Sequence, residues 1–347
     1  MVVGKNRVGP DLAAFGEVDL IERLRKKLSV TASEAVRKTS IIEGIGDDAA
    51  VLRWENGDTF LLLTCDTLVE KVHFPKGTPP DRIGWKAMAC NLSDIAAMGG
   101  IPQYAVVSLA CPAGTKVAEI DSIYAGMTEV SGRFEVAIVG GDTVESPRAL
   151  MVTVTVIGRV EKRRYVVRSG AKPGDVLCVT GDLGGSLLGK HLAFLPRVAE
   201  GRFLAANFSP TAMIDISDGL ASDLTKVVQA SHTTAELFAE HIPVSDAANR
   251  SAKRRRLSPL EMALHDGEDF ELLFTLPREK VDRCLSRFRK HFSTPITVIG
   301  RIKRGRRRPI LVHKDGTTAP LEARGYEHFR KSGWRTTAPS ARRRMSR

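Results

Sequence analysis

Short apolar segments that end in aspartate recur along this chain, and they constrain its fold more than any other feature of the sequence. "LLLTCDT" and "AIVGGDT" each run from aliphatic residues into one aspartate, whereas "IEGIGDDAAVL" and "AMIDISDG" each carry two aspartates. The end of a strand on a rigid scaffold is a common place for functional side chains. The pattern therefore predicts strands that deliver acids at their ends, namely Asp47, Asp48, Asp66, Asp142, Asp215 and Asp218.

Strand-like and helix-like segments alternate between these motifs. Apolar residues at helical spacing predict helices at residues 17–28, 82–98, 116–131, 184–194, 218–230 and 278–290. Apolar segments bounded by turn residues predict strands at residues 49–54, 59–67, 104–112, 135–142, 150–160, 176–180, 234–239, 270–276, 296–302 and 309–313. A chain of 347 residues is too long for one ordinary core. The predicted fold class is therefore α+β, with two domains of similar size.

Composition marks the domain junction and a tail. Glycine and proline beside a charge cluster at residues 162–175 predict the junction, so the domains are expected at residues 1–161 and 162–329. Residues 330–347 hold seven Lys or Arg and no acid, which predicts a basic, disordered tail.

The composition favours a cytoplasmic protein without a membrane segment. The first thirty residues carry charges throughout, and no apolar run approaches the roughly 18 residues of a membrane span. Five cysteines without a C-x-x-C pair argue against disulfides and against a zinc site. The net charge of +12 lies largely in the tail and in "KRRR" and "KRGRRR", without interleaved aromatic residues, so a nucleic-acid surface is not expected.

The acidic motifs indicate a bound cation. In "NLSD", Asn91 and Asp94 lie three residues apart on one helix face, and the acidic motifs contain no lysine or arginine of their own. Oxygen ligands without histidine suit Mg²⁺, which is usually shared with substrate phosphates. Several aspartates around several Mg²⁺ ions are typical of phosphoryl transfer. Taken alone, Gly-Asp-Asp also suits a turn, and the role of Asp47 and Asp48 stays open at this point.

Two segments match familiar nucleotide-binding motifs in part, but each lacks a feature that the motif requires. "GIGDDA" matches the dinucleotide fingerprint, but a strand-like segment follows it where a helix is required. "GGSLLGKH" nearly matches a P-loop, but His191 stands where a magnesium-binding serine or threonine is required. Any ATP is therefore expected to be held through metal ions.

Seven motifs together resemble those of the thiamine-monophosphate kinase family. They are "GIGDDAAVL", "TCDTLVEKVHF", "KAMACNLSDIAAMGG", "IVGGDTV", "RSGAKPGD", "IDISDGLASDL" and "GEDFELLF", and the resemblance covers roughly residues 12–329. The family belongs to an ATP-using superfamily with aminoimidazole ribonucleotide synthetase. The resemblance implies ATP-dependent phosphorylation of thiamine monophosphate with Mg²⁺. It also implies a homodimer joined by a four-stranded sheet of the N-terminal domain, which binds metal and ATP, with the C-terminal domain completing the active site.

The resemblance also implies roles for individual residues. The implied metal ligands are Asp48, Thr64, Cys65, Asp66, Asp94, Asp142, Asp215 and Asp218, of which Asp66, Asp94 and Asp142 are expected to be catalytic. The implied nucleotide contacts are Tyr124, Gly141, Asp142, Arg168 and Ser217. The implied contacts to thiamine monophosphate are His73, Glu268 and the position of Ala323. Without the resemblance, His73 and Glu268 would be read as a surface histidine and a solvated loop acid.

The chain departs from the family pattern at three positions. Cys65 replaces a hydroxyl residue, Val144 replaces a common polar residue, and Ala323 falls where an aromatic residue often stacks on the thiamine. The alternatives are an enzyme of the same superfamily with another acceptor, a basic nucleic-acid-binding protein on a retired enzyme fold, and a metal-binding regulatory protein.

Overall fold

The computed structural model describes residues 12–28, 40–54, 57–255, 258–305 and 308–329. The predicted basic tail at residues 330–347 lies outside this part. The chain divides into two compact units, one built from its two terminal segments and one from residues 33–325. In the first unit, α1 (Leu12–Phe15) and α2 (Glu17–Leu28) are described, and the Glu17 carboxylate accepts the His328 backbone N–H at 2.9 Å. The helix predicted at residues 17–28 is confirmed.

The larger unit begins with a mixed sheet of six strands in the order β1-β2-β3-β6-β4-β5. Neighbouring strands in this sheet are antiparallel, except for β4 and β5, which run parallel. The six strands are β1 (Ile41–Glu43), β2 (Ala50–Arg53), β3 (Thr59–Val69), β4 (Ile101–Cys111), β5 (Ala137–Glu145) and β6 (Met151–Glu161). The predicted hairpin of β2 and β3 is confirmed. The expected count of four strands is wrong, because β1 and β2 extend the sheet beyond β3.

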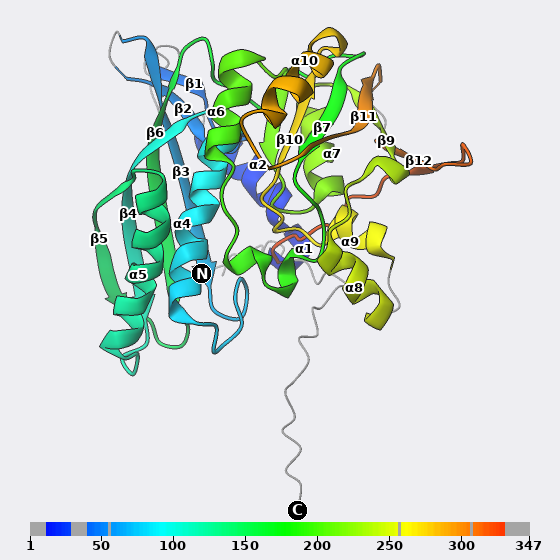
Figure 1. Cartoon of the computed structure of the whole chain (residues 1–347). Coiled ribbons are helices and arrows are strands. Elements are labelled where there is room, and N and C mark those ends of the chain that lie inside the picture. The colour runs from blue at the N-terminus through cyan, green and yellow to red at the C-terminus, as the bar shows by residue number, and fades with distance from the viewer. Residues whose placement is uncertain (1–11, 29–39, 55–56, 256–257, 306–307, 330–347) are drawn as a thin grey trace, which may run out of the picture. The chain divides into compact units, whose positions relative to one another are not determined.

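Helices cover one face of this sheet. α4 (Pro80–Ala97) packs on β3, β4 and β6, and α5 (Val117–Arg133) packs on α4 and β5 (Figure 1). The strands explain this arrangement by their alternation. In β6, Val152, Val154 and Val156 are fully buried beneath the helices, whereas the threonines between them point to the other face. We call this second face, on the side of Thr153 and Thr155, the open face.

A second mixed sheet has seven strands in the order β13-β12-β9-β11-β7-β10-β8. Only β9 and β12 pair in parallel. Its strands are β7 (Val176–Thr180), β8 (Ala212–Asp215), β9 (Thr234–Phe238), β10 (Leu272–Leu276), β11 (Ile296–Lys303), β12 (Ile310–Val312) and β13 (Thr318–Pro320). The accompanying helices are α6 (Val198–Asn207), α7 (Leu220–Ala230), α8 (Asp246–Arg255), α9 (Pro259–His265) and α10 (Arg278–Arg289). The two-sheet arrangement confirms the predicted α+β class; the domain boundary after residue 161 stays a prediction.

The helix predicted at residues 184–194 is wrong. This segment forms two single 3-10 turns, Ser186–Leu188 and Lys190–Leu192. Gly184, Gly185 and Gly189 have φ angles of 83°, 70° and 141°, which an α-helix does not allow. Apolar spacing favoured a helix, and the glycines overrode it.

α4 connects the two sheets. It packs on the first sheet and also contacts β8 of the second. In its C-terminal half, Asp94 accepts a hydrogen bond from Thr64 in the middle of β3, and Ser93 donates one to Asp215 at the end of β8, which brings two acidic motifs close to α4. None of the helices in the described ranges is both long and apolar enough to cross a membrane.

Candidate active site

Seven aspartates from six segments of the larger unit form what we call the aspartate cluster. They come from the turn before β2, from β3 and α4, from the end of β8 and the loop after it, and from α7. They are Asp47, Asp48, Asp66, Asp94, Asp215, Asp218 and Asp223. Their electrostatic effects on one another link them all. Asp218 raises the pKa of Asp66, Asp66 that of Asp94, and Asp48 that of Asp215.

Three members of the cluster lack a cationic partner in the described part of the chain: Asp66, Asp94 and Asp215. Asp94 accepts a short hydrogen bond from the Thr64 hydroxyl, and Asp215 accepts one from the Ser93 hydroxyl at 2.6 Å. Burial is the main cause that raises the pKa of all three carboxyls, and neighbouring aspartates raise it further. These carboxylates are therefore ionised only at a free-energy cost that a bound cation would offset.

Asp47 and Asp48 pair with Arg168, 120 residues away from Asp48. The guanidinium donates to Asp48 Oδ1 at 2.7 Å, and the Arg168 backbone N–H donates to Asp47 Oδ2 at 3.1 Å. The other oxygen of Asp48 is buried without a hydrogen-bond partner. Burial raises the pKa of Asp48 to about 6 against the opposing effect of Arg168. An acceptor of this kind is available to a cation.

Lys226 supplies the second cation. Its ammonium group donates to Asp218 Oδ2 at 2.6 Å and to Asp223 Oδ1 at 2.8 Å. Asp223 also accepts the backbone N–H of Asp218 at 3.0 Å, and burial raises its pKa to about 6. Neither Asp223 nor Lys226 belongs to the site predicted from the sequence. Their spacing of three residues at the start of α7 is the signal that could have found them.

The donor set of the cluster fits a hard cation. Seven carboxylates face the two cations Arg168 and Lys226, and hydroxyl oxygens of Thr64 and Ser93 lie among them. Within the described ranges, no three His, Cys, Asp or Glu side chains stand close enough to hold a metal ion by themselves. A cation here would therefore take part of its coordination from other oxygens. Mg²⁺ commonly does so, because it binds through one or two carboxylates together with substrate phosphates and water.

Two predicted metal ligands lie elsewhere within one chain. Cys65 follows the alternation of β3 onto the open face, where its sulfur accepts a hydrogen bond from Thr155 at 3.2 Å. Asp142 lies on β5, in register with Ser108 of the open face. β6 and β4 separate β5 from β3, so Asp142 and Asp66 are about 14 Å apart across the sheet. One chain alone does not bring Asp142 into the aspartate cluster.

The predicted nucleotide contacts also fall into two groups, one beside the aspartate cluster and one away from it. Arg168 and Ser217 lie beside the cluster, whereas Gly141 is on β5 and Tyr124 on the adjacent helix α5. A Cβ atom at Gly141 would come within 1.9 Å of the Val107 carbonyl oxygen. The close approach of β5 to β4 at this point therefore requires glycine.

The predicted substrate contacts His73 and Glu268 share one partner that the sequence analysis missed. Lys86 of α4 donates to the His73 carbonyl oxygen at 2.8 Å and to both carboxylate oxygens of Glu268 at 2.6 and 2.8 Å. Nothing in the local sequence singles out Lys86, because its partner is 182 residues away. Ala323 is exposed after β13, two residues before Gly325, whose N–H bonds the Ser222 hydroxyl at 3.0 Å.

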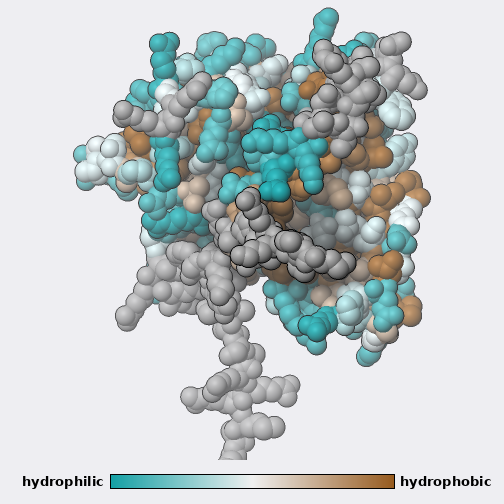
Figure 2. Space-filling view, turned by 180° about the vertical axis from the view of Figure 1, so that it is seen from behind, coloured by the Kyte–Doolittle hydropathy of each residue, from teal (hydrophilic) through white to brown (hydrophobic). Residues whose placement is uncertain are grey.

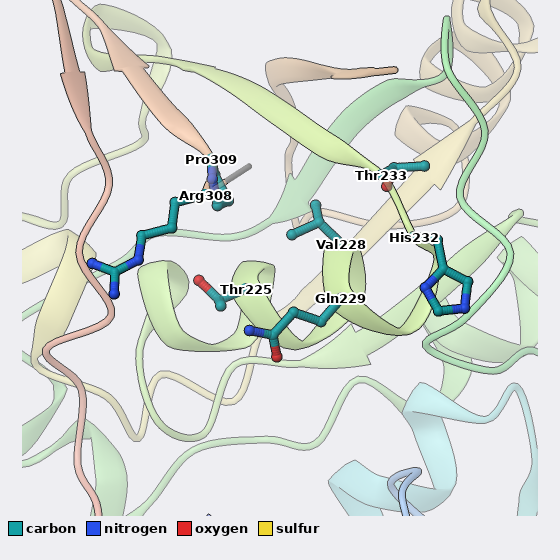
Figure 3. A pocket seen from close by; sticks show the side chains of 7 residues that line it. All are labelled: Thr225, Val228, Gln229, His232, Thr233, Arg308 and Pro309. Atoms are coloured by element: carbon teal, nitrogen blue, oxygen red, sulfur yellow. The ribbon is translucent and has the colours of Figure 1, made fainter. Parts of the chain in front are cut away.

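A separate cavity of about 240 Å³ lies between α7 and the segment that leads into β12 of the second sheet. Figure 3 shows its lining, in which Thr225, Val228 and Gln229 come from α7, His232 and Thr233 from the turn that follows, and Arg308 and Pro309 from the segment before β12. None of the site residues predicted from the sequence lines this cavity.

Comparison with known proteins agrees with this geometry. Family models described as AIR synthase related protein, N-terminal domain and C-terminal domain, match residues 46–160 and 172–312. The chain is 36% identical to thiamine-monophosphate kinase of Bacillus subtilis (strain 168) over 337 residues, which cover 90% of this chain and 99% of that protein. The chain belongs to the thiamine-monophosphate kinase family. The predicted family and enzyme class are confirmed.

Other relatives support the assignment. Thiamine-monophosphate kinase of Rhodopirellula baltica is 40% identical over 266 residues, which cover 75% of this chain and 83% of that protein. Among solved structures, AaThiL complexed with AMPPCP and TMP matches with a TM-score of 0.77 at 29% identity, over 92% of this chain and 99% of that one. The family relationship thus spans both sheets and the aspartate cluster between them.

Proposed function

We propose that this thiamine-monophosphate kinase family member transfers the γ-phosphoryl group of ATP to thiamine monophosphate, yielding thiamine diphosphate and ADP. The observation that carries the proposal is the aspartate cluster, in which seven carboxylates have two cationic partners, Arg168 and Lys226, among the described residues. The relatives carry the same activity in their names, and AaThiL was solved with an ATP analogue and TMP. A set of acids this dense would repel phosphates unless cations came with them.

The proposed metal is Mg²⁺. Within one chain, Asp48, Thr64, Asp66, Asp94, Asp215 and Asp218 would hold it. When bound, Mg²⁺ supplies positive charge that offsets the phosphate oxygens of both substrates. This assignment is supported by the buried free oxygen of Asp48 and by the carboxylates of Asp66 and Asp215, which have no cationic partner among the described residues.

The chain's own residues position the two substrates for direct in-line transfer. Arg168 and Ser217 lie beside the cluster, where they can contact the nucleotide phosphates, and His73 and Glu268 hold the thiamine end. The terminal phosphate oxygen of thiamine monophosphate attacks the γ-phosphorus of ATP, and the bond to the β-phosphate oxygen breaks to release ADP. The second pKa of a phosphate monoester is about 6, so the attacking phosphate is largely ionised and needs no strong general base.

A homodimer completes this proposal, because one chain leaves Asp142 outside the cluster. Among the described residues of the larger unit, helices α4 and α5 cover one face of the first sheet (Figure 1), and Tyr104, Val106 and Val144 on the open face are each more than one third exposed. Figure 2 views the molecule from behind, and hydrophobic residues reach its surface near the right margin, where the first sheet lies. Two open faces packed together would bury these side chains and bring Asp142 of one subunit toward Cys65 of the other.

The proposal includes a cytoplasmic location and excludes a nucleic-acid partner. Cys65, Cys90, Cys111, Cys178 and Cys284 are free thiols, as is usual in a reducing compartment. The acidic cluster disfavours a nucleic-acid backbone at the site.

An assay of ADP release tests the reaction. Thiamine monophosphate should stimulate release strongly, whereas thiamine and aminoimidazole ribonucleotide precursors should not. Equal stimulation by another acceptor would contradict the proposed substrate while leaving the family intact. Tight RNA binding at physiological salt, without any turnover, would instead favour a nucleic-acid-binding protein.

Subunit mixing tests the composite site. Asp66→Asn and Asp142→Asn chains should each be nearly inactive, but co-expression of both should restore about a quarter of wild-type activity, because half of the dimers would contain one intact site. No recovery would show that each chain carries its own complete site. Val106→Arg on the open face should yield monomers in light scattering.

A further inference from the structure

Lys86 is a buried lysine that joins the two predicted substrate contacts. Its side chain is 1% exposed, and its Nζ donates three hydrogen bonds. One goes to the carbonyl oxygen of His73 and one to each carboxylate oxygen of Glu268. An ammonium group has three N–H donors, so its hydrogen-bonding capacity is filled by these two residues.

Lys86 has no access to a ligand of its own. Its partner Glu268 keeps 22% of its side chain exposed, and a carboxylate offers about four acceptor sites, of which Lys86 takes two. The remaining acceptor sites are available to a ligand at the exposed edge. Any influence of Lys86 on that ligand therefore passes through Glu268 or through the turn that carries His73.

Both partners sit in locally ordered segments. Glu268 has φ of 54°, an uncommon angle for a residue with a side chain; its N–H donates to the Ser217 carbonyl at 2.7 Å, and its carbonyl accepts the Ser186 hydroxyl at 2.6 Å. His73 Nδ1 accepts the backbone N–H of Val69 at 2.9 Å. Lys86 thus links a turn after β3 to a loop before β10, which lie in different halves of the chain.

We propose that Lys86 is a positioning residue that sets the separation of His73 and Glu268 and so tunes affinity for the thiamine end of the acceptor. The inference rests on the proposed function, in which these two residues contact thiamine monophosphate. Binding groups need placement to about 0.5 Å, and a partner bonded to both of them can provide it. Because the thiamine end is remote from the transferred phosphoryl group, the effect should appear in substrate binding rather than in turnover.

The first test is Lys86→Met in the full-length protein, since methionine retains the apolar stem and removes the charge. The KM for thiamine monophosphate should rise about tenfold or more, while kcat stays within about threefold and the KM for ATP within about twofold. The matched control is Arg82→Met on the same helix, because Arg82 is exposed and pairs only at the surface with Asp81 at 3.5 Å. That control should leave both KM values unchanged.

A double-mutant cycle separates positioning from a purely structural role. If Lys86 acts through Glu268, the variant carrying both Lys86→Met and Glu268→Gln should bind thiamine monophosphate no more weakly than Glu268→Gln alone. The inference would be overturned if the losses of affinity in the two single variants multiplied in the double variant, or if Lys86→Met left the KM unchanged. The double variant leaves no unpaired carboxylate, so it keeps the test valid even if Lys86→Met alone fails to fold.

Wild-type protein distinguishes failure of this inference from failure of the proposed function. If the wild type neither binds thiamine monophosphate by calorimetry nor phosphorylates it, the proposed function fails and the role of Lys86 fails with it. If the wild type is active and only the predicted pattern in the variants is missing, the inference about Lys86 alone is overturned.

Discussion

Two buried acidic regions of this protein differ in whether their carboxylates have cationic partners. Immediately before β10 of the second sheet, Glu271 is 1% exposed and accepts two hydrogen bonds of 2.7 Å from Arg197, one of 2.9 Å from Lys190 and one of 2.8 Å from Thr180. In the aspartate cluster, Asp66, Asp94 and Asp215 have only hydroxyl donors or none in the described structure.

The difference shows which acids are structural and which are available for binding. Glu271 is neutralised by its own chain, so no external cation is needed. The cluster combines burial with mutual repulsion, which stabilises the protein less than paired charges would. Proteins commonly accept such a loss at a site that binds a ligand. We infer that the cluster, unlike the Glu271 network, depends on a cation from solution.

Removal of metal should therefore have the largest effect. Dialysis against EDTA should reduce ADP release to background, and added Mg²⁺ should restore it, because the cluster has too few cations to bind two phosphorylated substrates. Thermal unfolding with AMPPCP should occur at a higher temperature with Mg²⁺ than without. Full activity after chelation would contradict the comparison.

The Asp66→Asn substitution should cause the second-largest loss of activity. Turnover should fall by about 100-fold or more, because Asp66 is expected to share its cation with the phosphates. Without Mg²⁺, the variant should be at least as stable as the wild type, because one repelling carboxylate has been removed. Circular dichroism and steady-state kinetics check both parts. Exposed Asp121→Asn on α5 is the control, and kcat near the wild-type value in Asp66→Asn would exclude the assigned role.

Glu271→Gln should show the opposite pattern, with a loss of stability and little change in turnover. Breaking a buried ion pair on one side typically costs about 3 kcal/mol, because Arg197 and Lys190 lose their counter-ion. Urea unfolding should show this loss of stability, while kcat per folded molecule stays within about twofold of the wild type. A large drop in kcat with unchanged stability would place Glu271 in the active site instead.

The smallest effect concerns Asp269, which accepts the Gly184 N–H at 2.9 Å. Burial raises its pKa to about 8, so between pH 4 and 8 the folded state holds a proton that the unfolded state releases. Stability should therefore fall as pH rises through this window and level off above it. Asp269→Asn cannot titrate, and its melting temperature should exceed that of the wild type by a margin that grows by a few degrees from pH 5 to pH 8. A constant margin would show that Asp269 is ionised throughout.

Local pattern was sufficient for many elements and for the acidic motifs. The helix expected at residues 82–98 is α4, Pro80–Ala97, and the strand expected at residues 150–160 is β6, Met151–Glu161. Helices α6, α8 and α9 were not predicted. Their burial depends on contacts with distant segments, which a short window of sequence does not contain.

By itself the sequence determined the family, the two-domain α+β class and the motifs that carry the aspartates, because each depends on residues close together in the chain. The expected position at strand ends is correct for Asp215, which ends β8, but wrong for Asp66 and Asp142, which lie inside β3 and β5. Tertiary structure alone decided which acids acquire a counter-ion. Arg168 reaches Asp48 across 120 residues, and Lys86 reaches Glu268 across 182. It also decided that Asp142 stands three strands away from Asp66. Such pairings follow from strand order and helix packing, which the whole core sets together, so no local pattern encodes them.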